Sequence, residues 1–268
     1  MIANERLAFI LDRLKTHRAV TVSELSSLLA VSSETIRRDL VTLENQNRLQ
    51  RVHGGAVSSN LAKGYLSLPQ RQGENVRQKR QAAQTAIRLL REGDSIVIDS
   101  GSTSREFVSV LKANAQRLTV ITHSVCVFEE LRGQPGIRLI LLGGEYLSSE
   151  ECFCGESALE AIRKLHVSFS FIFPSAVSLK YGVADYVAEL VSIQKGYLEI
   201  ANQSVILADS SKFEKTALLK ICDTSPSSIF VTSEDLDDGV YELYRANGIR
   251  LYRDKETILH EENHPDFG

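Results

Sequence analysis

The stretch TVSELSSLLAVSSETIRRDLVTLENQNRLQRVHGGA, residues 21–56, decides the fold of the N-terminal part of this chain. Apolar residues recur at helical spacing in two segments, which a short turn at Val31-Ser32 separates. The second segment carries the adjacent Arg37 and Arg38, and a short basic stretch with a Gly-Gly pair follows it. This order of helix, turn, helix and hairpin predicts a winged helix-turn-helix, a fold that places one helix in the DNA major groove.

Three helices are expected here, each with apolar residues along one face. Polar residues suited to capping precede the second and third helices: Thr21 or Ser23, and then Ser32 or Ser33. Asn47 is expected to end the third helix in the left-handed conformation. The residues expected to face inward are Leu7, Ile10, Leu11, Leu14, Leu25, Leu28, Leu29, Ile36, Leu40 and Leu43.

The third helix carries the residues expected to read DNA. Arg38 lies about 200° around this helix from Ile36, at about 100° per residue, so it points away from the core. Exposed arginines and small hydroxyl residues suit contacts with base edges and phosphates, and the Gly-Gly pair is expected to supply the positive φ angles of a tight hairpin. The DNA-contact candidates are Ser32, Ser33, Thr35, Arg37, Arg38, Arg51, His53, Gly54 and Gly55. The alternative is a small helical docking module whose arginines form a solvated face.

Charge divides the 268 residues into two segments with different expected partners. Residues 1–80 carry 13 Lys and Arg against 7 Asp and Glu, a net +6, whereas residues 81–268 carry 18 against 27, a net −9. A basic front end suits a polyanion such as DNA, and the acidic remainder does not. No apolar run approaches the roughly 18 residues of a membrane span. Four cysteines form no evident disulfide framework or zinc site, which favours the reducing cytoplasm.

Residues 58–80 lack a sustained apolar period and are expected to form an extended connection that leads into a helix from about Glu74. The basic residues Arg77, Lys79 and Arg80 are interpreted as a solvated helix face, with a further phosphate contact as the alternative. The expected domains are residues 1–57 for DNA binding, residues 58–80 as linker, and residues 81–268 for effector sensing and oligomerisation.

The C-terminal part alternates short apolar runs with helical patterns, which predicts an α/β domain with a mostly parallel sheet. The expected strands are Ser95–Ile98, Leu118–Ile121, Arg138–Leu142, Ser168–Phe173, Ser204–Ala208, Ile229–Val231 and Arg250–Tyr252. The expected helices cover about 81–91, 104–112, 124–132, 156–164, 185–201 and 235–247. In such sheets ligands bind at the carboxyl ends of the strands.

Four loops of small polar residues follow strands of this domain. They are residues 99–104, 122–124, 143–145 and 209–212. The first opens a helix, where hydroxyl groups and free N–H groups form a cradle for an anion, although such a run is also common as a simple helix cap. We expect the four loops to converge on one pocket, with Lys212 supplying positive charge.

Both halves resemble the DeoR family of bacterial transcriptional regulators. The N-terminal half resembles it through VSSETIRRDLVTLE and LQRVHGGA, and the C-terminal half through IDSGSTS, ITHS, LGGE, CGESA and ADSSKF. The resemblance implies a sensor fold similar to ribose-phosphate isomerases and CoA transferases, with a phosphorylated sugar or sugar-alcohol as effector. This chain departs from the family at residues 173–176, more loosely at 179–190, and at His123, where asparagine is frequent; a pocket role for His123 competes with packing in the loop.

The resemblance also implies which residues hold the effector. The phosphate role falls on the hydroxyl residues that follow Gly101, and the ligand-facing acid and base roles fall on Asp99, Asp209 and Lys212. Lys195 matches a basic position that is common in the family. The complete effector-binding set is Asp99, Gly101, Ser102, Thr103, Ser104, Thr122, His123, Ser124, Gly143, Gly144, Asp185, Lys195, Asp209 and Lys212.

The function expected is that of a DNA-binding regulator of carbohydrate catabolism. A homodimer or homotetramer, assembled through the C-terminal domains, would hold paired recognition helices on an operator until the effector releases them. Repression is favoured over activation because it is commoner in the family. The alternative is a sugar-phosphate isomerase or transferase with a DNA-binding appendage, in which the same acids and lysine move protons. No cofactor or metal is expected, since the sequence holds no nucleotide P-loop or metal-ligand cluster.

Overall fold

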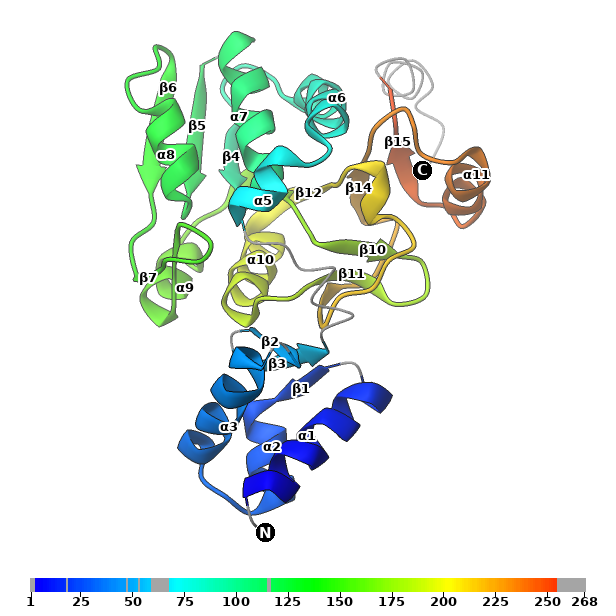
Figure 1. The fold of residues 1–268 in the computed structure, drawn as a ribbon. Coiled ribbons are helices and arrows are strands. Elements are labelled where there is room, and N and C mark those ends of the chain that lie inside the picture. The colour runs from blue at the N-terminus through cyan, green and yellow to red at the C-terminus, as the bar shows by residue number, and fades with distance from the viewer. Residues whose placement is uncertain are drawn as a thin grey trace. The chain divides into compact units, whose positions relative to one another are not determined.

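The structure is a computed structural model that describes residues 3–17, 19–46, 48–52, 54–58, 68–114 and 117–254. The chain divides into two compact units: the first comprises residues 1–67 and 186–188, and the second comprises residues 68–185 and 189–268 (Figure 1). Asn47 and His53, which the sequence places at a helix end and on the DNA-binding wing, lie outside the described residues. The two units are described one at a time.

The first unit has the elements of a winged helix-turn-helix. They are α1 (Ala3–His17), β1 (Ala19–Thr21), α2 (Val22–Leu29), α3 (Ser33–Asn45), β2 (Leu49–Val52) and β3 (Gly55–Ser58). Thr21 Oγ1 accepts a hydrogen bond from the Glu24 backbone N–H at 3.1 Å, and Ser32 Oγ accepts one from that of Thr35 at 3.2 Å. These are two of the four capping residues considered from the sequence. The turn between α2 and α3 places Ala30 in the left-handed region, at φ 50°.

One apolar cluster holds the first unit together, and it contains every residue expected to face inward except Leu28. Leu28 is 51% exposed because it lies 60° or so to one side of the buried Leu25 stripe on this two-turn helix. A bidentate ion pair adds to the packing: Arg6 on α1 donates to Asp39 on α3 at 2.8 and 3.1 Å. Since both side chains are largely buried, the pair fixes α3 against α1.

The wing is an antiparallel sheet with strand order β1-β3-β2. Gly54 has φ 80°, as expected for the hairpin turn, but Gly55 does not have a positive φ. Gly55 is needed for another reason: a Cβ atom there would lie 2.0 Å from the carbonyl oxygen of Val20. The expectation that both glycines serve the turn is therefore wrong for Gly55, which instead permits the close approach of β1.

We expect Gly55→Ala to destabilise the first unit by at least about 1–3 kcal/mol, the usual cost of forcing atoms into a packed site. The measurement is hydrogen exchange of the amides in β1–β3 of the full chain, together with operator affinity. Gly73→Ala is the matched control because a Cβ atom there meets nothing within 4 Å. Equal exchange rates in the two variants would contradict the close-approach argument.

The second unit is built on a seven-stranded sheet in which all neighbouring strands are parallel. Its order is β15-β14-β12-β9-β4-β5-β6. The strands are β4 (Ser95–Ile98), β5 (Leu118–Thr122), β6 (Ile137–Leu141), β9 (Val167–Ile172), β12 (Ala201–Leu207), β14 (Ser228–Val231) and β15 (Arg250–Tyr252). Each overlaps a strand predicted from the sequence.

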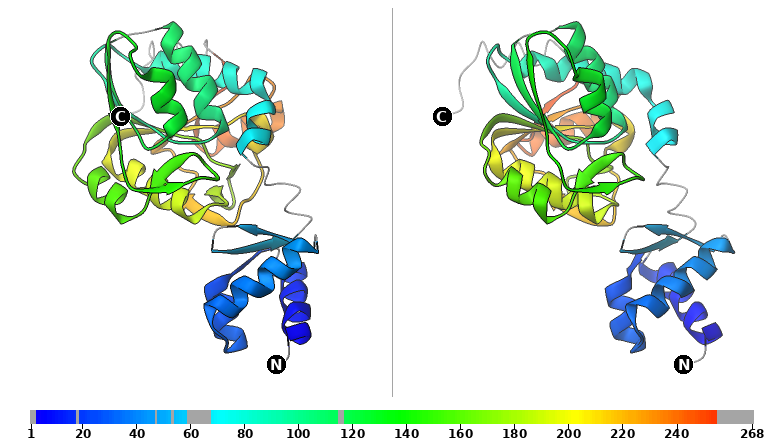
Figure 2. Two further views of the ribbon diagram at one scale, coloured as in Figure 1. Left: turned by 60° about the vertical axis from the view of Figure 1, so that its left-hand side comes forward. Right: turned by 90° about the vertical axis from the view of Figure 1, so that its left-hand side faces the viewer.

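Helices cover both faces of this sheet, as Figure 2 shows. They are α6 (Val76–Ala86), α7 (Ser102–Ala113) and α8 (Val125–Leu131) on one face, and α9 (Glu156–Ile162), α10 (Ala188–Ile200) and α11 (Asp238–Ala246) on the other. Alternate residues of one strand enter different cores: Ile96 and Ile98 pack with the first set of helices, and Val97 packs with the second. The near-continuous apolar runs in the sequence reflect this burial on both sides.

Several short elements were not predicted. They are α5 (Leu68–Gly73), β7 (Glu145–Leu147), β8 (Cys152–Cys154), β10 (Ala176–Ser178), β11 (Gly182–Asp185), β13 (Leu219–Cys222) and the single-turn helix η2 (Ser210–Lys212). The single-turn helix η1 (Ile87–Leu89) lies within the helix expected over about 81–91. Strands of three or four residues are too short to show a period of two. The extended connection expected before a helix at about Glu74 is wrong over residues 68–73, which form α5, whereas α6 begins at Val76, close to the expected start. Pro69 fits α5 because proline is tolerated in the first turn of a helix.

The strand order places a topological switch point between β4 and β9. From β4 the chain adds β5 and β6 on one side, and then returns to add β9, β12, β14 and β15 on the other. In open parallel sheets ligands bind outside the carboxyl ends of the strands at such a point. Asp99 follows β4 directly, so one of the predicted acids lies at this position.

Candidate functional site

Helix α3 presents two arginines to solvent, as the sequence predicts. The side chain of Arg38 is 80% exposed and that of Arg37 is 64% exposed, while Ile36 is fully buried. Glu34 lies 3.4 Å from Arg38 Nε and 3.8 Å from Arg37 Nη1, distances typical of weak, solvated ion pairs. Both guanidinium groups can therefore leave Glu34 for a phosphate or a base edge at little cost.

The hydroxyl residues at the start of α3 are exposed but not all free. Ser32 Oγ accepts from the Thr35 backbone N–H and also lies 2.9 Å from Thr35 Oγ1. Ser33 lies in the first turn and is exposed. These residues present hydroxyl groups beside the positive end of the helix, which suits a phosphate contact.

The wing arginine is tied to α3. Glu44 accepts from Arg51 twice: its Oε2 from Arg51 Nε at 2.7 Å, and its Oε1 from the Arg51 backbone N–H at 2.9 Å. This contact neutralises part of the charge of Arg51 and fixes the start of the wing to the end of α3. The sequence offered no signal for it, because the two residues are seven apart and lie on different elements.

In the second unit, the loop after β4 leads into the N-terminus of α7. Gly101 is the N-cap residue, with φ 121°, and no side chain caps the helix. Ser104 Oγ donates to the Gly101 carbonyl at 2.7 Å, so its hydroxyl serves the loop itself. Among the described residues, the largely buried hydroxyls of Ser102 and Thr103 have no hydrogen-bond partner. These two hydroxyls and the first N–H groups of α7 are open to an anion.

Asp99 is fully buried and accepts three hydrogen bonds. Its Oδ1 accepts from the Ser100 backbone N–H at 2.8 Å, and its Oδ2 accepts from that of Phe173 at 3.2 Å and from Gln194 Nε2 at 2.9 Å. Burial raises the pKa of Asp99 to about 7, although these hydrogen bonds oppose the shift. Gln194 also donates to Asp185 Oδ2 at 3.3 Å, and so one amide joins two buried acids.

His123 lies in the same buried network. Its Nδ1 is 2.9 Å from the Tyr197 hydroxyl, and its Nε2 is 3.2 Å from Ser100 Oγ. Burial lowers the pKa of His123 to about 3, so the ring is neutral and its contacts are hydrogen bonds rather than ion pairs. The neighbouring loop residues serve structure: Thr122 Oγ1 donates to the Ile98 carbonyl, and Ser124 Oγ accepts from the first turn of α8.

These two groups make stability depend on pH in opposite directions. In the unfolded chain His123 has a pKa near 6.5 and is protonated below it, whereas the folded ring stays neutral down to about pH 3. The free energy of unfolding therefore falls as pH falls through this range. Between about pH 3.8 and 7, Asp99 is protonated in the folded state and ionised in the unfolded chain. The free energy of unfolding therefore falls as pH rises through this range.

We expect His123→Asn to gain stability relative to the wild type as pH falls from 6.5 to 4, by about 1.4 kcal/mol per pH unit at most. The reason is that only the wild type carries a buried ring that resists protonation. Urea unfolding of both proteins across pH 4–7.5 measures the difference. A difference that stays constant over this range would show that the ring titrates normally in the folded state.

A second polar cluster follows β12. Asp209 is fully buried; its Oδ1 accepts from the backbone N–H and the hydroxyl of Ser211 and from Asn75 Nδ2 at 3.2 Å. Its Oδ2 has no partner among the described residues. Burial lowers the pKa of Lys79 to about 8; the nearby charge of Asp209 raises this pKa and that of Lys212 lowers it further. The Lys212 backbone N–H donates to the Asp209 carbonyl at 3.0 Å. A buried oxygen without a donor, beside two cations, is a site that a ligand hydroxyl and an anion would satisfy.

The structure separates the other predicted residues from these clusters. Lys195 is exposed on α10 and acts electrostatically on Cys222, whereas Gln194, one position earlier, faces Asp99. Gly143 is exposed. Gly144 is needed for packing, since a Cβ atom there would lie 2.3 Å from the Cys154 carbonyl oxygen. The loop after β6 follows the outermost strand of the sheet, which places it farthest from β12.

Sequence reasoning missed five residues that the structure joins to the site: Arg71, Asn75, Lys79, Gln194 and Tyr197. The interpretation of Lys79 as part of a solvated face is wrong, because its side chain is buried and donates to the Arg71 and Glu74 carbonyls. The basic pattern of this segment gave no sign of the burial. For Gln194 and Tyr197 a signal existed: polar groups three residues apart on the apolar face of α10.

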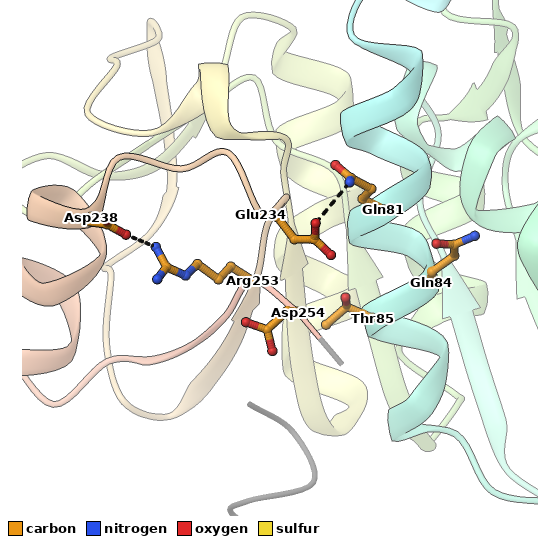
Figure 3. A pocket seen from close by; sticks show the side chains of 7 residues that line it. All are labelled: Gln81, Gln84, Thr85, Glu234, Asp238, Arg253 and Asp254. Atoms are coloured by element: carbon orange, nitrogen blue, oxygen red, sulfur yellow. Dashed lines mark hydrogen bonds and ion pairs between the residues drawn. The ribbon is translucent and has the colours of Figure 1, made fainter. Parts of the chain in front are cut away.

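A cavity of about 560 Å³ lies elsewhere in the second unit (Figure 3). It is lined by Gln81, Gln84, Thr85, Glu234, Asp238, Arg253 and Asp254. Across the described ranges, no group of three or more His, Cys, Asp or Glu residues is placed to hold a metal ion. Over the same ranges, every helix is too short or too polar to cross a membrane.

Comparison with known proteins identifies both units. Residues 6–61 match the family model of the DeoR-like helix-turn-helix domain, and residues 74–234 match that of the DeoR C terminal sensor domain. A putative aga operon transcriptional repressor from Escherichia coli O157:H7 is 28% identical, with 92% of this chain and 93% of the relative covered. The lactose phosphotransferase system repressor of Lactococcus lactis is 34% identical over 80% of this chain and 85% of its own length.

The second unit also has a slight likeness to ribose 5 phosphate isomerase A from Neisseria gonorrhoeae. The TM-score is 0.38 at 18% sequence identity, with 50% of this chain and 52% of the isomerase covered. A likeness of this size says nothing about chemistry. The two family models, the relatives of nearly full length and the helix-turn-helix itself agree with one another. The chain therefore belongs to the DeoR family of DNA-binding transcriptional regulators.

Proposed function

We propose that this protein is a cytoplasmic repressor of a carbohydrate catabolic operon, and that a phosphorylated sugar or sugar-derived compound releases it from its operator. The names of two relatives support the proposal, since one is a repressor of the aga operon and the other of a lactose phosphotransferase system. The arrangement of unsatisfied polar groups in the second unit supports the chemistry of the effector.

The observation that carries the effector class is the set of groups that lack partners within the described residues. At the end of β4 these are the Ser102 and Thr103 hydroxyls with the uncapped N-terminus of α7, and at the end of β12 the Oδ2 atom of Asp209. The first group needs an anion and the second needs a hydroxyl donor. Only β9 separates the two strands, so their carboxyl ends lie about 10 Å apart along the sheet edge. A sugar with a phosphate at one end meets both needs.

Two lysines supply positive charge at this site. Lys212 and the buried Lys79 oppose the charge of Asp209 and attract an anionic ligand into a unit that is acidic overall. Gln194 Nε2 donates to both Asp99 and Asp185, and its Oε1 has no partner among the described residues. In this proposal Oε1 accepts a hydrogen bond from a sugar hydroxyl. In this proposal Gly143 and Lys195 do not contact the effector.

The DNA-bound form is proposed to be a homodimer or homotetramer. Two α3 helices would enter successive major grooves about 34–36 Å apart, with Arg37 and Arg38 on base edges and phosphates. To release the DNA, the effector must bind a second arrangement of the units more tightly than the operator-bound one. The affinity ratio between the two arrangements sets the extent of induction.

An enzyme with a DNA-binding appendage is the competing function. Asp99, Asp209 and Lys212 could move protons, but His123, the nearest imidazole to Asp99, is held neutral by a pKa of about 3. We propose that these residues bind the ligand without chemical turnover.

The test is a thermal-shift panel of glucose 6-phosphate, fructose 1-phosphate, ribose 5-phosphate and glycerol 3-phosphate, each beside its unphosphorylated form, followed by an operator-shift assay. We expect a phosphorylated compound to stabilise the protein and release the DNA, and its unphosphorylated form to do neither. Conversion of that compound into product by the purified protein would favour the enzyme. DNA binding that no compound of the phosphorylated class affects would contradict the proposed effector.

A further inference from the structure

One side of α6 carries three amide side chains at intervals of three residues: Asn75 at its N-cap, then Gln78 and Gln81. Each donates to an acidic loop at the carboxyl end of the sheet. Asn75 Nδ2 donates to Asp209 Oδ1 at 3.2 Å and to Ser211 Oγ at 3.0 Å. We call these three amides the amide stripe of α6.

The other two amides bind the loop after β14. Gln78 Nε2 donates to Asp235 Oδ2 at 3.2 Å, and Gln81 Nε2 donates to Glu234 Oε2 at 3.3 Å, a contact drawn in Figure 3. Residues three apart lie on one side of a helix, so the amide stripe forms one continuous contact with the ends of two adjacent strands. The donors are neutral and the acceptors are carboxylates, at distances near the long end of the hydrogen-bond range. These bonds are directional but readily exchanged.

The start of α6 is held by side-chain contacts. Asn75 has φ 50° and ψ 33°, a left-handed conformation that asparagine adopts more readily than most residues with a Cβ atom. Lys79 donates to the Arg71 and Glu74 carbonyls, which holds the turn between α5 and α6. Arg71 in turn donates to both oxygens of the buried Glu150. The turn therefore keeps its shape through side-chain contacts, and the Asn75 contact depends on Asp209.

We propose that the amide stripe is a latch through which effector binding weakens operator binding, with Asn75, Gln78 and Gln81 acting as positioning residues for the effector response. The proposal rests on the proposed function, because it takes Asp209 as an effector ligand. Asn75 donates to Asp209 Oδ1, and an effector hydroxyl that donates to the unpartnered Oδ2 shares this carboxylate, so a shift of Asp209 toward the effector loosens the Asn75 contact and opens the latch. Helix α5, which precedes this turn, begins at the first residue after the DNA-binding unit.

The two functional states then differ in the latch. It is closed in the operator-binding state and open in the effector-bound state. Linkage requires that a change which opens the latch weakens operator binding and strengthens effector binding, and that a change which closes it does the reverse. General destabilisation of the fold would weaken both.

Gln78 provides the cleanest test because it contacts neither Asp209 nor any other proposed effector ligand. Gln78→Glu faces Asp235 with a like charge and opens the latch, whereas Gln78→Arg pairs with Asp235 and closes it. Gln84→Glu and Gln84→Arg are the matched controls: this glutamine is on the same helix and lines the cavity of Figure 3, but has no hydrogen bond within the described part of the chain.

Operator affinity is measured first, in the absence of any sugar, by fluorescence anisotropy with the full chain. We expect Gln78→Glu to bind the operator about tenfold more weakly than Gln78→Arg, with the Gln84 pair differing much less. Affinity for the panel compound that stabilises the wild type is then measured by calorimetry, with inorganic phosphate as the probe if no sugar compound binds. The expected order is the reverse, with Gln78→Glu the tighter binder.

Changes of the same sign in both affinities, or a difference no larger than that of the Gln84 pair, would overturn the latch. Failure of the proposed effector class looks different: the operator affinities of the Gln78 pair still diverge, but no phosphorylated sugar binds the wild type. Amide hydrogen exchange over residues 76–82 gives a third measurement, and should be faster in Gln78→Glu than in Gln78→Arg.

Discussion

Arg38→Ala is expected to lower operator affinity by about 100-fold and to leave effector binding unchanged. Arg38 is the most exposed arginine of α3, and its one ion pair, with Glu34, is 3.4 Å long and solvated. Removal of a guanidinium group that contacts a base edge costs about 1–3 kcal/mol, and loss of an accompanying phosphate contact adds to this. Ile36 and Leu40, which anchor the opposite side of the helix, are untouched, so the fold should persist.

The measurement is an operator titration at several salt concentrations, with circular dichroism as the check on folding. Arg163→Ala is a charge-matched control, since Arg163 is an exposed arginine of the second unit paired with Glu156. If Arg38→Ala bound the operator as the wild type does, α3 would not be the recognition helix. A loss equal to that of Arg163→Ala would reduce the role of Arg38 to general electrostatics.

The double variant Ser102→Ala, Lys212→Ala is expected to bind the operator normally but to lose its response to the effector. Ser102 offers an unpartnered hydroxyl at the N-terminus of α7, and Lys212 lies beside Asp209. A phosphate held by a hydroxyl, helix N–H groups and a lysine loses both a donor and a full charge, so the concentration required for release should rise at least about 100-fold.

Release of operator DNA, titrated with the compound that the thermal-shift panel selects, measures this effect. Lys215→Ala is the control, because Lys215 is an exposed lysine three residues later in the same loop. A double variant that responds at wild-type concentrations would place the anion elsewhere. An altered response in Lys215→Ala alone would point to a charge effect of the whole loop rather than to a defined contact.

The sequence predicted well the elements whose residues share one strong period. The central strands are buried on both faces and stand out as apolar runs, and helices such as α3 and α7 are long enough to show a 3.6-residue repeat. It failed at β7, β8, β10, β11 and β13, whose three or four residues are too few to show a period of two; β7 pairs with β8 and β10 with β11 in local hairpins, and β13 pairs with the distant β11. Helix α5 likewise depends on a distant segment, since its main anchor is the contact of Arg71 with Glu150, 79 residues later.

The candidate site could be predicted where it depends on neighbouring residues in the sequence, but not where it depends on contacts between distant segments of the chain. Residues 99–104, after β4, predict an anion-binding loop because serine, threonine and glycine precede the start of a helix. Nothing local marks Asn75 as a partner of Asp209, 134 residues away, and nothing marks Lys79 as buried. The resemblance assigns Lys195 to the site because the family often has a basic residue there. The structure instead points the neighbouring Gln194 inward, where it donates to Asp99.

The two hydrogen bonds from Arg51 to Glu44 have a consequence for the operators that this regulator can use. One carboxylate accepts from both the backbone N–H and the side chain of Arg51, which ties the start of β2 to the end of α3. In the proposed homo-oligomer, we therefore expect a base inserted between the positions that α3 and the wing contact within one half-site to weaken binding. Variation among target sequences should then collect in the spacer between the half-sites.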